Sequence, residues 1–332
     1  MIKPEIKQQL TIEIEMEEAY LEFERVNGVK YYEKDRFLKW DFEAHSDDTN
    51  PNSIFHDKLW RKDPYYFTTC HISAVVLLQM LLHAKRGEPL EIMGMLRGQT
   101  FGREFYIYNV ISFPAVGTET LIAIPDDDLT YEDNFGEYLH SNGFHEERRG
   151  WFHTHPSYKC WLSSTDVKLE ETGQMSDPFL AIVVDPTTTT NNGAVEIGVF
   201  RTFPKNFVPE ESHNGKRILP SEKIADFGSS WNRYYPLKVE IFKTELDQKM
   251  LTKLWRQYWM TTLSASPIIF NKNLNDRKVV DLYKKFEERK KIGMKTSASL
   301  KELIEEIDEI QNIYKRGVKG LELKDMLFNQ LF

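Results

Sequence analysis

The sequence predicts an α/β fold in which a mixed sheet carries helices on both faces and is followed by a C-terminal helical segment. Short apolar runs of strand length alternate with longer helical patterns between residues 67 and 200, which is typical of such folds. One of the helical patterns is too densely apolar for a helix that lies on the surface. Beyond residue 270, apolar side chains recur at helical spacing, which predicts the closing helices.

The first predicted elements belong to a charged N-terminal segment and the helix that follows it. Residues 13–24 predict a helix in which a few apolar side chains stand among many glutamates, and residues 46–52 form a turn-rich break. The apolar side chains between Ile72 and Leu82 are so dense that we expect a largely buried helix. Residues 87–89, Gly-Glu-Pro, end this helix because glycine and proline commonly terminate helices.

The middle of the chain predicts further strands and helices, separated by turn residues and polar loops. The expected strands are residues 90–96, 105–113, 150–155, 179–184, 194–200 and 237–241. The expected helices are residues 130–141, a helix that begins near residue 166, and residues 244–263. Two polar stretches, residues 187–193 and 205–222, are interpreted as loops.

Two more helices are predicted over residues 271–290 and 299–314. Ser299 and Glu302 form a capping-box pattern at the start of the second helix. Its apolar residues recur at intervals of three and four, and they are Leu300, Leu303, Ile304, Ile307, Ile310 and Tyr314. Such a stripe needs a partner surface, which is either another part of this chain or another protein.

The composition narrows the class of protein. With 41% hydrophobic and 28% charged residues, the chain is typical of soluble globular proteins. Because no apolar run is long enough to cross a bilayer and no signal-peptide pattern is present, we expect no membrane association. Two cysteines, Cys70 and Cys160, are too few for a disulfide framework, which indicates a reducing, intracellular compartment. The net charge of −8 argues against broad nucleic-acid binding.

The most informative stretch contains two histidines, His153 and His155, and is followed by Ser163 and Asp166. In an extended strand, residues two apart point to the same face, and the proline after the second histidine ends the strand. Asp166 lies in the first turn of the next helix, for which Ser163 or Ser164 is the N-cap. Two imidazole nitrogens and one carboxylate can therefore meet at one ion. Three protein ligands with an open fourth position are typical of catalytic zinc.

Other interpretations of these residues are weaker but open. Two histidines this close also occur in half-buried strands without any metal, although the serine and aspartate at fixed spacing favour a metal site. Cys160 could supply a thiolate to zinc. Because two histidines and an aspartate already complete the ligand set, we expect Cys160 to pack beside Trp161 instead. Cysteine-protease chemistry would need a histidine that the metal does not bind.

Together with Glu91, these residues resemble the JAMM motif of the MPN+ metalloproteases. The flanking residues 90–95 and 150–163 are also similar to that family, and the second stretch resembles both the proteasome-lid deubiquitinase and the signalosome deneddylase. Four later segments favour the signalosome deneddylase subfamily; they are residues 200–205, 224–228, 234–235 and 254–259. The resemblance covers roughly residues 53 to 264. It implies the MPN fold, a mixed sheet similar to that of cytidine deaminases. It also implies one Zn²⁺ per chain and the cleavage of isopeptide bonds to ubiquitin or ubiquitin-like proteins.

The resemblance further implies roles for single residues. The two histidines and Asp166 would bind the zinc, while Glu91 would carry the proton of the attacking water to the leaving lysine amine. Glu91 borders an apolar strand, where desolvation raises the pKa of a carboxyl group and suits a proton carrier. Ser163 would stabilise the oxyanion in addition to, or instead of, capping the helix. Glu119 matches a loop position that can occlude the metal site and hold the free enzyme inactive.

The chain departs from the family pattern at several positions. Ser157 and Lys159 stand where the close subfamilies carry glycines, which allow the slim tail of the modifier to approach. Arg97 stands where an aliphatic residue is usual. Leu121 and Ile122 stand where an arginine is common, so a latch that relies on this arginine is in doubt. These differences indicate a divergent member with tuned activity.

We therefore expect an N-terminal extension (residues 1–52), an MPN+ metalloprotease domain (residues 53–264) and C-terminal helices for complex assembly (residues 265–332). The leading hypothesis is a zinc isopeptidase, cytoplasmic and nuclear, that removes a ubiquitin-like modifier from cullin lysines as the catalytic subunit of the signalosome. Its partners would be the other subunits, among them an MPN subunit, reached through the MPN surface and the C-terminal helices.

Three alternatives differ in chemistry or in class. One is a deubiquitinating JAMM isopeptidase. Another is a non-catalytic MPN scaffold, which the intact histidines and aspartate argue against because such relatives typically lack them. A nucleoside deaminase shares the broad fold, but its Pro-Cys-x-x-Cys signature is missing from this sequence.

Overall fold

The computed structural model describes residues 17–32, 58–117, 126–144, 146–175, 178–192, 194–209, 221–264, 272–292 and 297–328. Within them lies a nine-stranded sheet with the order β1-β9-β2-β4-β3-β5-β6-β7-β8. The strands are β1 (Lys30–Tyr31), β2 (Thr69–Ser73), β3 (Glu91–Phe101), β4 (Glu104–Gly117), β5 (Glu147–Thr154), β6 (Leu180–Asp185), β7 (Glu196–Thr202), β8 (Tyr234–Pro236) and β9 (Lys238–Lys243).

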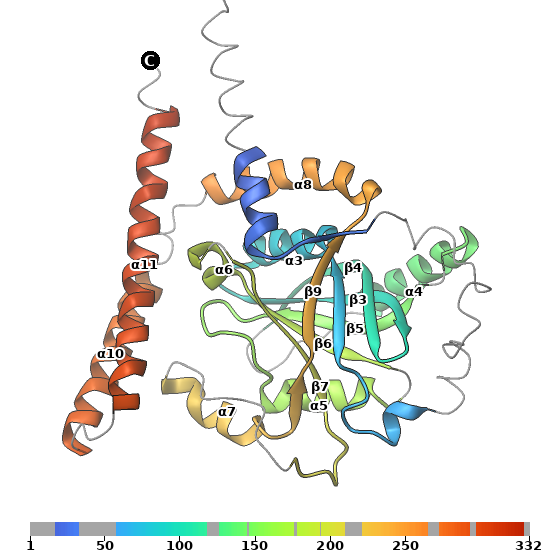
Figure 1. Cartoon of the computed structure of the whole chain (residues 1–332), viewed down its shortest axis with the longest axis horizontal. Helices are drawn as coiled ribbons and strands as arrows, with labels where there is room; N and C mark the ends of the chain where they lie inside the picture. The colour runs from blue at the N-terminus through green and yellow to red at the C-terminus, as the bar shows by residue number, and fades with distance from the viewer. Residues whose placement is uncertain are drawn as a thin grey trace, which may run out of the picture.

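Helices lie on both sides of this sheet, as predicted. The labelled helices of the chain are α3 (Ala74–Gly87), α4 (Asp126–Ser141), α5 (Ser164–Gly173), α6 (Pro186–Asn192), α7 (Ile224–Ser230), α8 (Glu245–Ser264), α10 (Lys272–Ile292) and α11 (Ser297–Phe328), with 3-10 turns η2 (Leu59–Arg61) and η3 (Ser221–Lys223). Helices α3 and α8 lie on one side and α5 and α7 on the other (Figure 1). Parallel and antiparallel pairs are mixed, since β5 runs antiparallel to β3 and parallel to β6. The predicted fold class is therefore confirmed.

Helix α3 is buried as expected, but it begins later than predicted. Its N-cap is Ser73, whose hydroxyl accepts a hydrogen bond from the backbone N–H of Val75 (3.2 Å), and its last residue is Gly87. Ile72 was expected in the helix and lies instead in β2, where it is paired with Ile107 of β4 and Ile241 of β9. The prediction was wrong here because a fully buried strand and a buried helix are both uniformly apolar.

The predicted polar loop at residues 187–193 is mostly helix α6. Pro186 occupies the first helical position, where its missing N–H costs nothing. The Asp185 carboxylate accepts hydrogen bonds from the Thr188 backbone N–H (2.8 Å) and hydroxyl (2.6 Å), as an N-cap does. The threonines are weak helix formers, so this turn depends on its cap, which propensity alone does not reveal.

The described part of the N-terminal segment packs against the domain. Residues 17–26 are helical, and the rings of Tyr20 and Phe23 lie 5.6 and 5.2 Å from that of Trp255 in α8. Strand β1 pairs in parallel with β9. Tyr20 and Phe23 are therefore part of the hydrophobic core, whereas the two residues of β1 are exposed.

The C-terminal helices α10 and α11 form an antiparallel pair beside the domain (Figure 1). Ion pairs join them, namely Lys278–Glu309 (3.2 Å), Lys285–Glu306 (2.9 Å) and Arg289–Glu302 (2.8 Å). Helix α11 begins two residues before Ser299 and extends to residue 328. The predicted apolar stripe is divided, because Leu303 is buried whereas Leu300, Ile304, Ile307 and Tyr314 are exposed.

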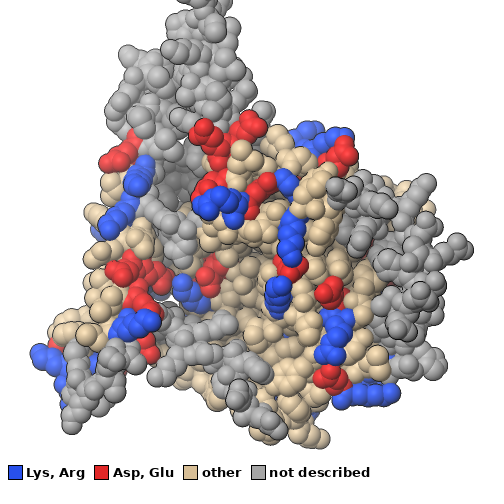
Figure 2. Space-filling view, viewed as in Figure 1, with Lys and Arg blue, Asp and Glu red and all other residues tan. Residues whose placement is uncertain are grey.

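The surface and the helices show two general properties. On the face in Figure 2, basic and acidic side chains are interspersed among the described residues. None of the described helices combines the length and the apolar character that a bilayer span requires.

Candidate metal centre

Strand β5 carries the first histidine of the motif into the interior of the sheet. His153 is opposite Met93 of β3 on one side and opposite Val183 of β6 on the other. The start of β3 is tied to the end of β5, because the backbone N–H of Ile92 donates to the Thr154 hydroxyl (3.0 Å). This contact brings Glu91, the first residue of β3, to the end of β5, where His153 lies and which His155 directly follows.

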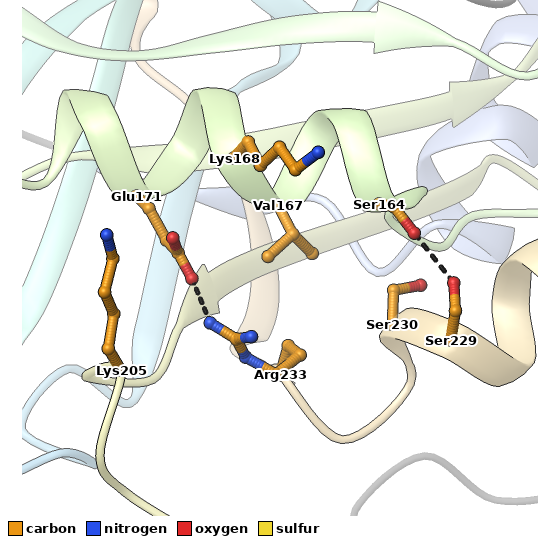
Figure 3. Close-up of a pocket in the computed structure, with 8 residues that line it drawn as sticks. All are labelled: Ser164, Val167, Lys168, Glu171, Lys205, Ser229, Ser230 and Arg233. Carbon is orange, nitrogen blue, oxygen red and sulfur yellow. Dashed lines mark hydrogen bonds and ion pairs between the residues drawn. The ribbon is translucent and has the colours of Figure 1, made fainter.

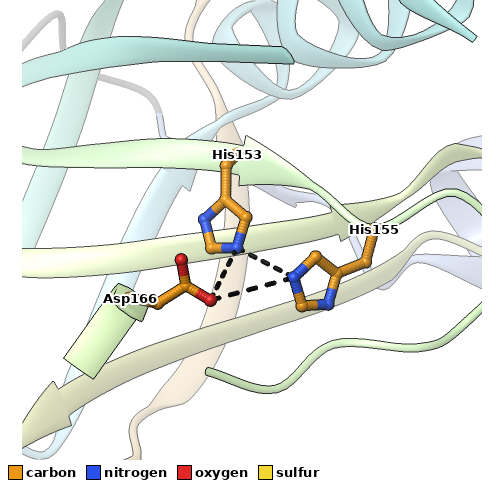
Figure 4. Close-up of side chains that lie close together, drawn as sticks. All are labelled: His153, His155 and Asp166. Carbon is orange, nitrogen blue, oxygen red and sulfur yellow. Dashed lines mark hydrogen bonds and ion pairs between the residues drawn. The ribbon is translucent and has the colours of Figure 1, made fainter. Parts of the chain in front are cut away.

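The three predicted ligands meet at one point (Figure 4). His153 Nε2 lies 3.0 Å from His155 Nε2 and 3.4 Å from Asp166 Oδ2, and His155 Nε2 lies 4.0 Å from the same oxygen. All three residues are buried, with exposures of 0, 2 and 9%. Among the described residues, they form the one cluster of this kind whose ligand atoms all lie within 4.8 Å of one another.

These distances fit a zinc ion. Zinc bonds to nitrogen and oxygen of about 2.1 Å in a tetrahedron place neighbouring ligand atoms about 3.4 Å apart. The three observed separations, 3.0, 3.4 and 4.0 Å, bracket this edge length. Three protein atoms leave one position of a tetrahedron open to solvent or substrate.

Hydrogen bonding also presents a lone pair from His155. Its Nδ1 lies 3.0 Å from the backbone carbonyl of Lys159, which can only accept a hydrogen bond. The proton of a neutral ring therefore resides on Nδ1, and Nε2 points to the cluster unprotonated. His153 stacks on Trp151, with centroids 4.6 Å apart, and its Nδ1 has no hydrogen-bond partner in the described part of the chain.

The electrostatics of the cluster favour a positive charge between its donor atoms. Burial opposes ionisation of Asp166, but His153 and His155 outweigh it and hold the pKa of Asp166 well below its usual range. Burial, followed by the proximity of His153, lowers the pKa of His155 to about 3. For His153, burial lowers the pKa, but the Asp166 carboxylate prevails and the net shift is upward. An ionised carboxylate beside two buried imidazoles suits a divalent cation.

Glu91 lies beside the cluster, half-buried. Burial raises the pKa of its carboxyl group, while His153 and a hydrogen bond from Tyr158 oppose this shift. The Tyr158 hydroxyl donates to Glu91 Oε1, and its ring stacks on His155 with centroids 4.5 Å apart. Lys223 Nζ lies 4.7 Å from the centroid of the same ring. Sequence reasoning missed Tyr158, although an aromatic residue between the motif histidines and serine was a visible signal.

Ser163, and not Ser164, is the N-cap of α5. Its hydroxyl accepts from the backbone N–H of Asp166 (3.2 Å), while its own N–H donates to Asp166 Oδ2 (2.7 Å). This capping box uses a lone pair of the Ser163 hydroxyl, whose proton has no acceptor among the described residues. The hydroxyl of Ser164 is bound to Asp226 (3.2 Å) and Ser229 (2.7 Å) in α7. The capping role and the oxyanion role of Ser163 are therefore compatible.

A groove of about 680 Å³ flanks α5 on the side of α7 (Figure 3). It is lined by Ser164, Val167, Lys168, Glu171, Lys205, Ser229, Ser230 and Arg233. An ion pair between Glu171 and Arg233, and the bond between Ser164 and Ser229, cross it. These links hold in place the helix that carries Asp166. The groove is separate from the three-residue cluster.

The remaining predicted residues divide into three groups. Cys160 is buried in the same core cluster as Trp161, and its thiol lies 3.4 Å from the backbone carbonyl of Glu196. Arg97, the unusual residue of β3, is buried and ion-paired with Glu132 of α4. Glu119, together with Leu121 and Ile122, lies outside the described residues.

Comparison with known proteins identifies the family of this chain. Residues 65–178 match the family model described as JAB1/Mov34/MPN/PAD-1 ubiquitin protease. The chain is 35% identical over 331 residues to COP9 signalosome complex subunit 5 of Emericella nidulans, covering 94% of this chain and 96% of that protein. It is 34% identical over 325 residues to the Dictyostelium discoideum protein of the same name, with the same coverage.

A plant relative shows a comparable similarity. The chain is 36% identical over 303 residues to COP9 signalosome complex subunit 5b of Arabidopsis thaliana, covering 86% of this chain and 85% of that protein. The resemblance to the MPN+ metalloproteases is thereby confirmed. The chain belongs to the family of COP9 signalosome complex subunit 5 proteins, within the wider JAB1/Mov34/MPN/PAD-1 ubiquitin protease family.

Proposed function

We propose that this protein is a zinc-dependent isopeptidase that removes a ubiquitin-like modifier from cullin lysines as the catalytic subunit of a signalosome. One observation carries the proposal: two imidazole nitrogens and a carboxylate oxygen converge within 4.8 Å in a member of this family. A non-catalytic scaffold would have no need of such a buried polar cluster, which is costly unless it binds an ion.

In this proposal, His153, His155 and Asp166 hold the ion. Bound zinc would supply Lewis-acid chemistry, because it lowers the pKa of water from about 15.7 toward 7 and polarises a carbonyl group. The carbonyl of Lys159 keeps the His155 ring in the tautomer that a metal requires. The Ser163 N–H holds Asp166 Oδ2, the carboxylate oxygen nearest to both histidines.

Glu91 transfers the proton. Its carboxylate accepts a proton from the attacking water and releases it to the lysine amine as the isopeptide bond breaks. The raised pKa of Glu91 brings its proton affinity closer to neutral pH, which is where a general base and acid works best. The Tyr158 hydroxyl fixes one carboxylate oxygen and leaves the other for the reaction. The free proton of the Ser163 hydroxyl is available to the oxyanion of the tetrahedral intermediate.

Exposed side chains support assembly with other subunits. Leu300, Ile304 and Ile307 lie on α11 and are 49, 48 and 39% exposed. A helix with an apolar stripe of this kind is stabilised by packing against other helices. We therefore propose that the α10–α11 pair binds helices of further signalosome subunits, including an MPN partner, in the cytoplasm and the nucleus.

A deubiquitinase is the second candidate, because the matching family is described as a ubiquitin protease. The two are separated by turnover of a cullin that carries the ubiquitin-like modifier and of a ubiquitin conjugate, side by side. Wild type, Glu91→Gln and His153→Ala are assayed alone and in the assembled complex, together with zinc content by atomic absorption. We expect wild type to bind one zinc and to be active, Glu91→Gln to bind zinc without activity, and His153→Ala to lose both. Equal behaviour of the three proteins would refute the assignment.

A further inference from the structure

The loop that follows the second histidine has a strained backbone. Ser157 and Lys159 have positive φ angles of 78° and 68°. Residues with a Cβ atom rarely adopt this conformation, because the side chain crowds the following carbonyl oxygen. Glycine avoids the strain, so a loop with serine and lysine at these positions must be held by other contacts.

One buried carboxylate supplies these contacts. Asp185, at the end of β6, has no exposed surface. Its Oδ1 accepts the backbone N–H of Ser157 (2.9 Å), and its Oδ2 accepts the backbone N–H of Lys159 (3.0 Å). Both strained residues are therefore held by the two oxygens of a single side chain. The remaining capacity of Asp185 is used by Thr188 at the start of α6.

This loop also holds His155. The carbonyl of Lys159 receives the Nδ1–H of His155 at 3.0 Å. The position of that carbonyl is set by the conformation at residue 159, which the bond from the Lys159 N–H to Asp185 maintains. The orientation and tautomer of His155 are therefore transmitted from Asp185 through two hydrogen bonds.

We propose that Asp185 is a positioning residue of the metal centre, which clamps the strained 157–159 loop so that the Lys159 carbonyl orients His155 toward the ion. This inference rests on the proposed function, because it assumes that the cluster binds zinc. Asp185 touches neither the ligand atoms nor a substrate, so it acts only through the loop. The chain needs such a clamp because serine and lysine, which carry Cβ atoms, occupy the two positions with positive φ.

The experiment measures zinc affinity and ligand geometry in the full chain. Zinc dissociation constants are obtained by competition with a chromophoric chelator, and the absorption spectrum of the Co²⁺-loaded protein reports the coordination geometry. Asp185→Asn keeps the size of the side chain but replaces one acceptor oxygen by an NH₂ group, which cannot accept an N–H. We expect zinc affinity to fall by about 10–100-fold, as for other partners that orient metal ligands, and the Co²⁺ spectrum to change.

Two control variants separate the loop from the other contacts of Asp185. Thr188→Val removes the hydroxyl bond to Asp185 (2.6 Å) without touching the loop, and we expect zinc affinity close to that of wild type. Ser157→Gly with Lys159→Gly relieves the strain, so in the Asp185→Asn background this pair should restore most of the affinity. Lys159→Gly also removes an ion pair with Glu309 of α11 (3.5 Å). Lys159→Met removes the same ion pair but keeps the Cβ atom, so in the Asp185→Asn background it should not restore the zinc affinity.

Each outcome decides the proposal. It is overturned if Asp185→Asn binds zinc as wild type does, if Thr188→Val loses as much affinity, or if the glycine pair restores nothing. Should Asp185→Asn alone fail to fold, the variant that also carries both glycines is expected to fold and bind zinc, and its failure overturns the proposal. If wild type itself binds no zinc, the proposed function falls together with this inference. If only the Asp185 variants contradict expectation, the proposed function stands.

Discussion

Replacing Tyr158 by phenylalanine tests the mechanism where the structure is most specific. The change removes the hydroxyl that donates to Glu91 and keeps the ring that stacks on His155 and carries the Lys223 ammonium. A hydrogen bond to a charged acceptor contributes about 1.5–3 kcal/mol. If the transition state uses all of it, kcat falls by about 10–160-fold, since 1.36 kcal/mol corresponds to a factor of ten. Zinc content should not change, because no metal ligand is altered.

The same substitution has a defined effect on the pH dependence. The bond from Tyr158 stabilises the ionised form of Glu91, so its loss moves the pKa of Glu91 further upward, in the direction that burial already shifts it. The general base is then protonated over a wider range, and the acidic limb of kcat/KM moves to higher pH. The assay is hydrolysis of the modified cullin by the assembled complex between pH 5 and 9. Tyr138→Phe is the matched control, because Tyr138 is 61% exposed on α4.

A kcat within about twofold of wild type, with an unshifted acidic limb, would show that the Tyr158 hydroxyl does not act on Glu91. A loss of zinc from the variant would point instead to a role in supporting His155. Either result would refute the reasoning, whereas an unchanged KM with a reduced kcat would support it.

Three further predictions concern stability and metal binding. Glu132→Gln leaves the buried Arg97 without its anionic partner, so urea denaturation should show that the free energy of unfolding falls by about 3–5 kcal/mol. In a protein that already carries Arg97→Leu, the same Glu132→Gln change should cost less. Burial raises the pKa of Glu170 to about 8. The protonated carboxyl group of Glu170 therefore stabilises the fold below about pH 4.5, and this contribution is lost as the pH rises to about 8. Glu170→Gln should remove this decline and stabilise the protein at pH 8 by about 3–5 kcal/mol. Removing zinc with a chelator should lower the melting temperature measured by calorimetry, and Asp166→Asn should abolish the difference between the zinc-loaded and zinc-free protein. An equal melting temperature of the wild type with and without zinc would contradict a bound ion.

The metal cluster could be predicted because its residues are close in the sequence. His153 lies in β5, His155 directly follows the end of that strand, and Asp166 lies in the first turn of the next helix, so local geometry brings them together. The capping box between Ser163 and Asp166 is equally local. Contacts between residues this close in the sequence follow from strand and helix periodicity, which a single sequence displays directly.

The supporting contacts could not be predicted for the opposite reason. Tyr158 and Glu91 are 67 residues apart, and Asp185 lies 26 residues beyond Lys159. No periodic pattern links such positions, because the order of strands in the sheet decides which residues meet. The helix prediction for Ile72 was wrong for the same reason, since the strands that pair with β2 come from distant segments. Helix α6 was missed for a different reason: its cap, Asp185, is adjacent to it, but its threonines are weak helix formers.

The short strand β1 has a practical consequence for anyone who wishes to shorten this protein. A chain begun at residue 53, the start that the sequence predicts for the MPN+ domain, would lack both β1 and the helix at residues 17–26. Strand β9 would then present unpaired backbone groups at the edge of the sheet, and Trp255 would lose its aromatic cover. Open edges and bare aromatic rings promote aggregation. Truncated versions should therefore retain residues from 17 onward.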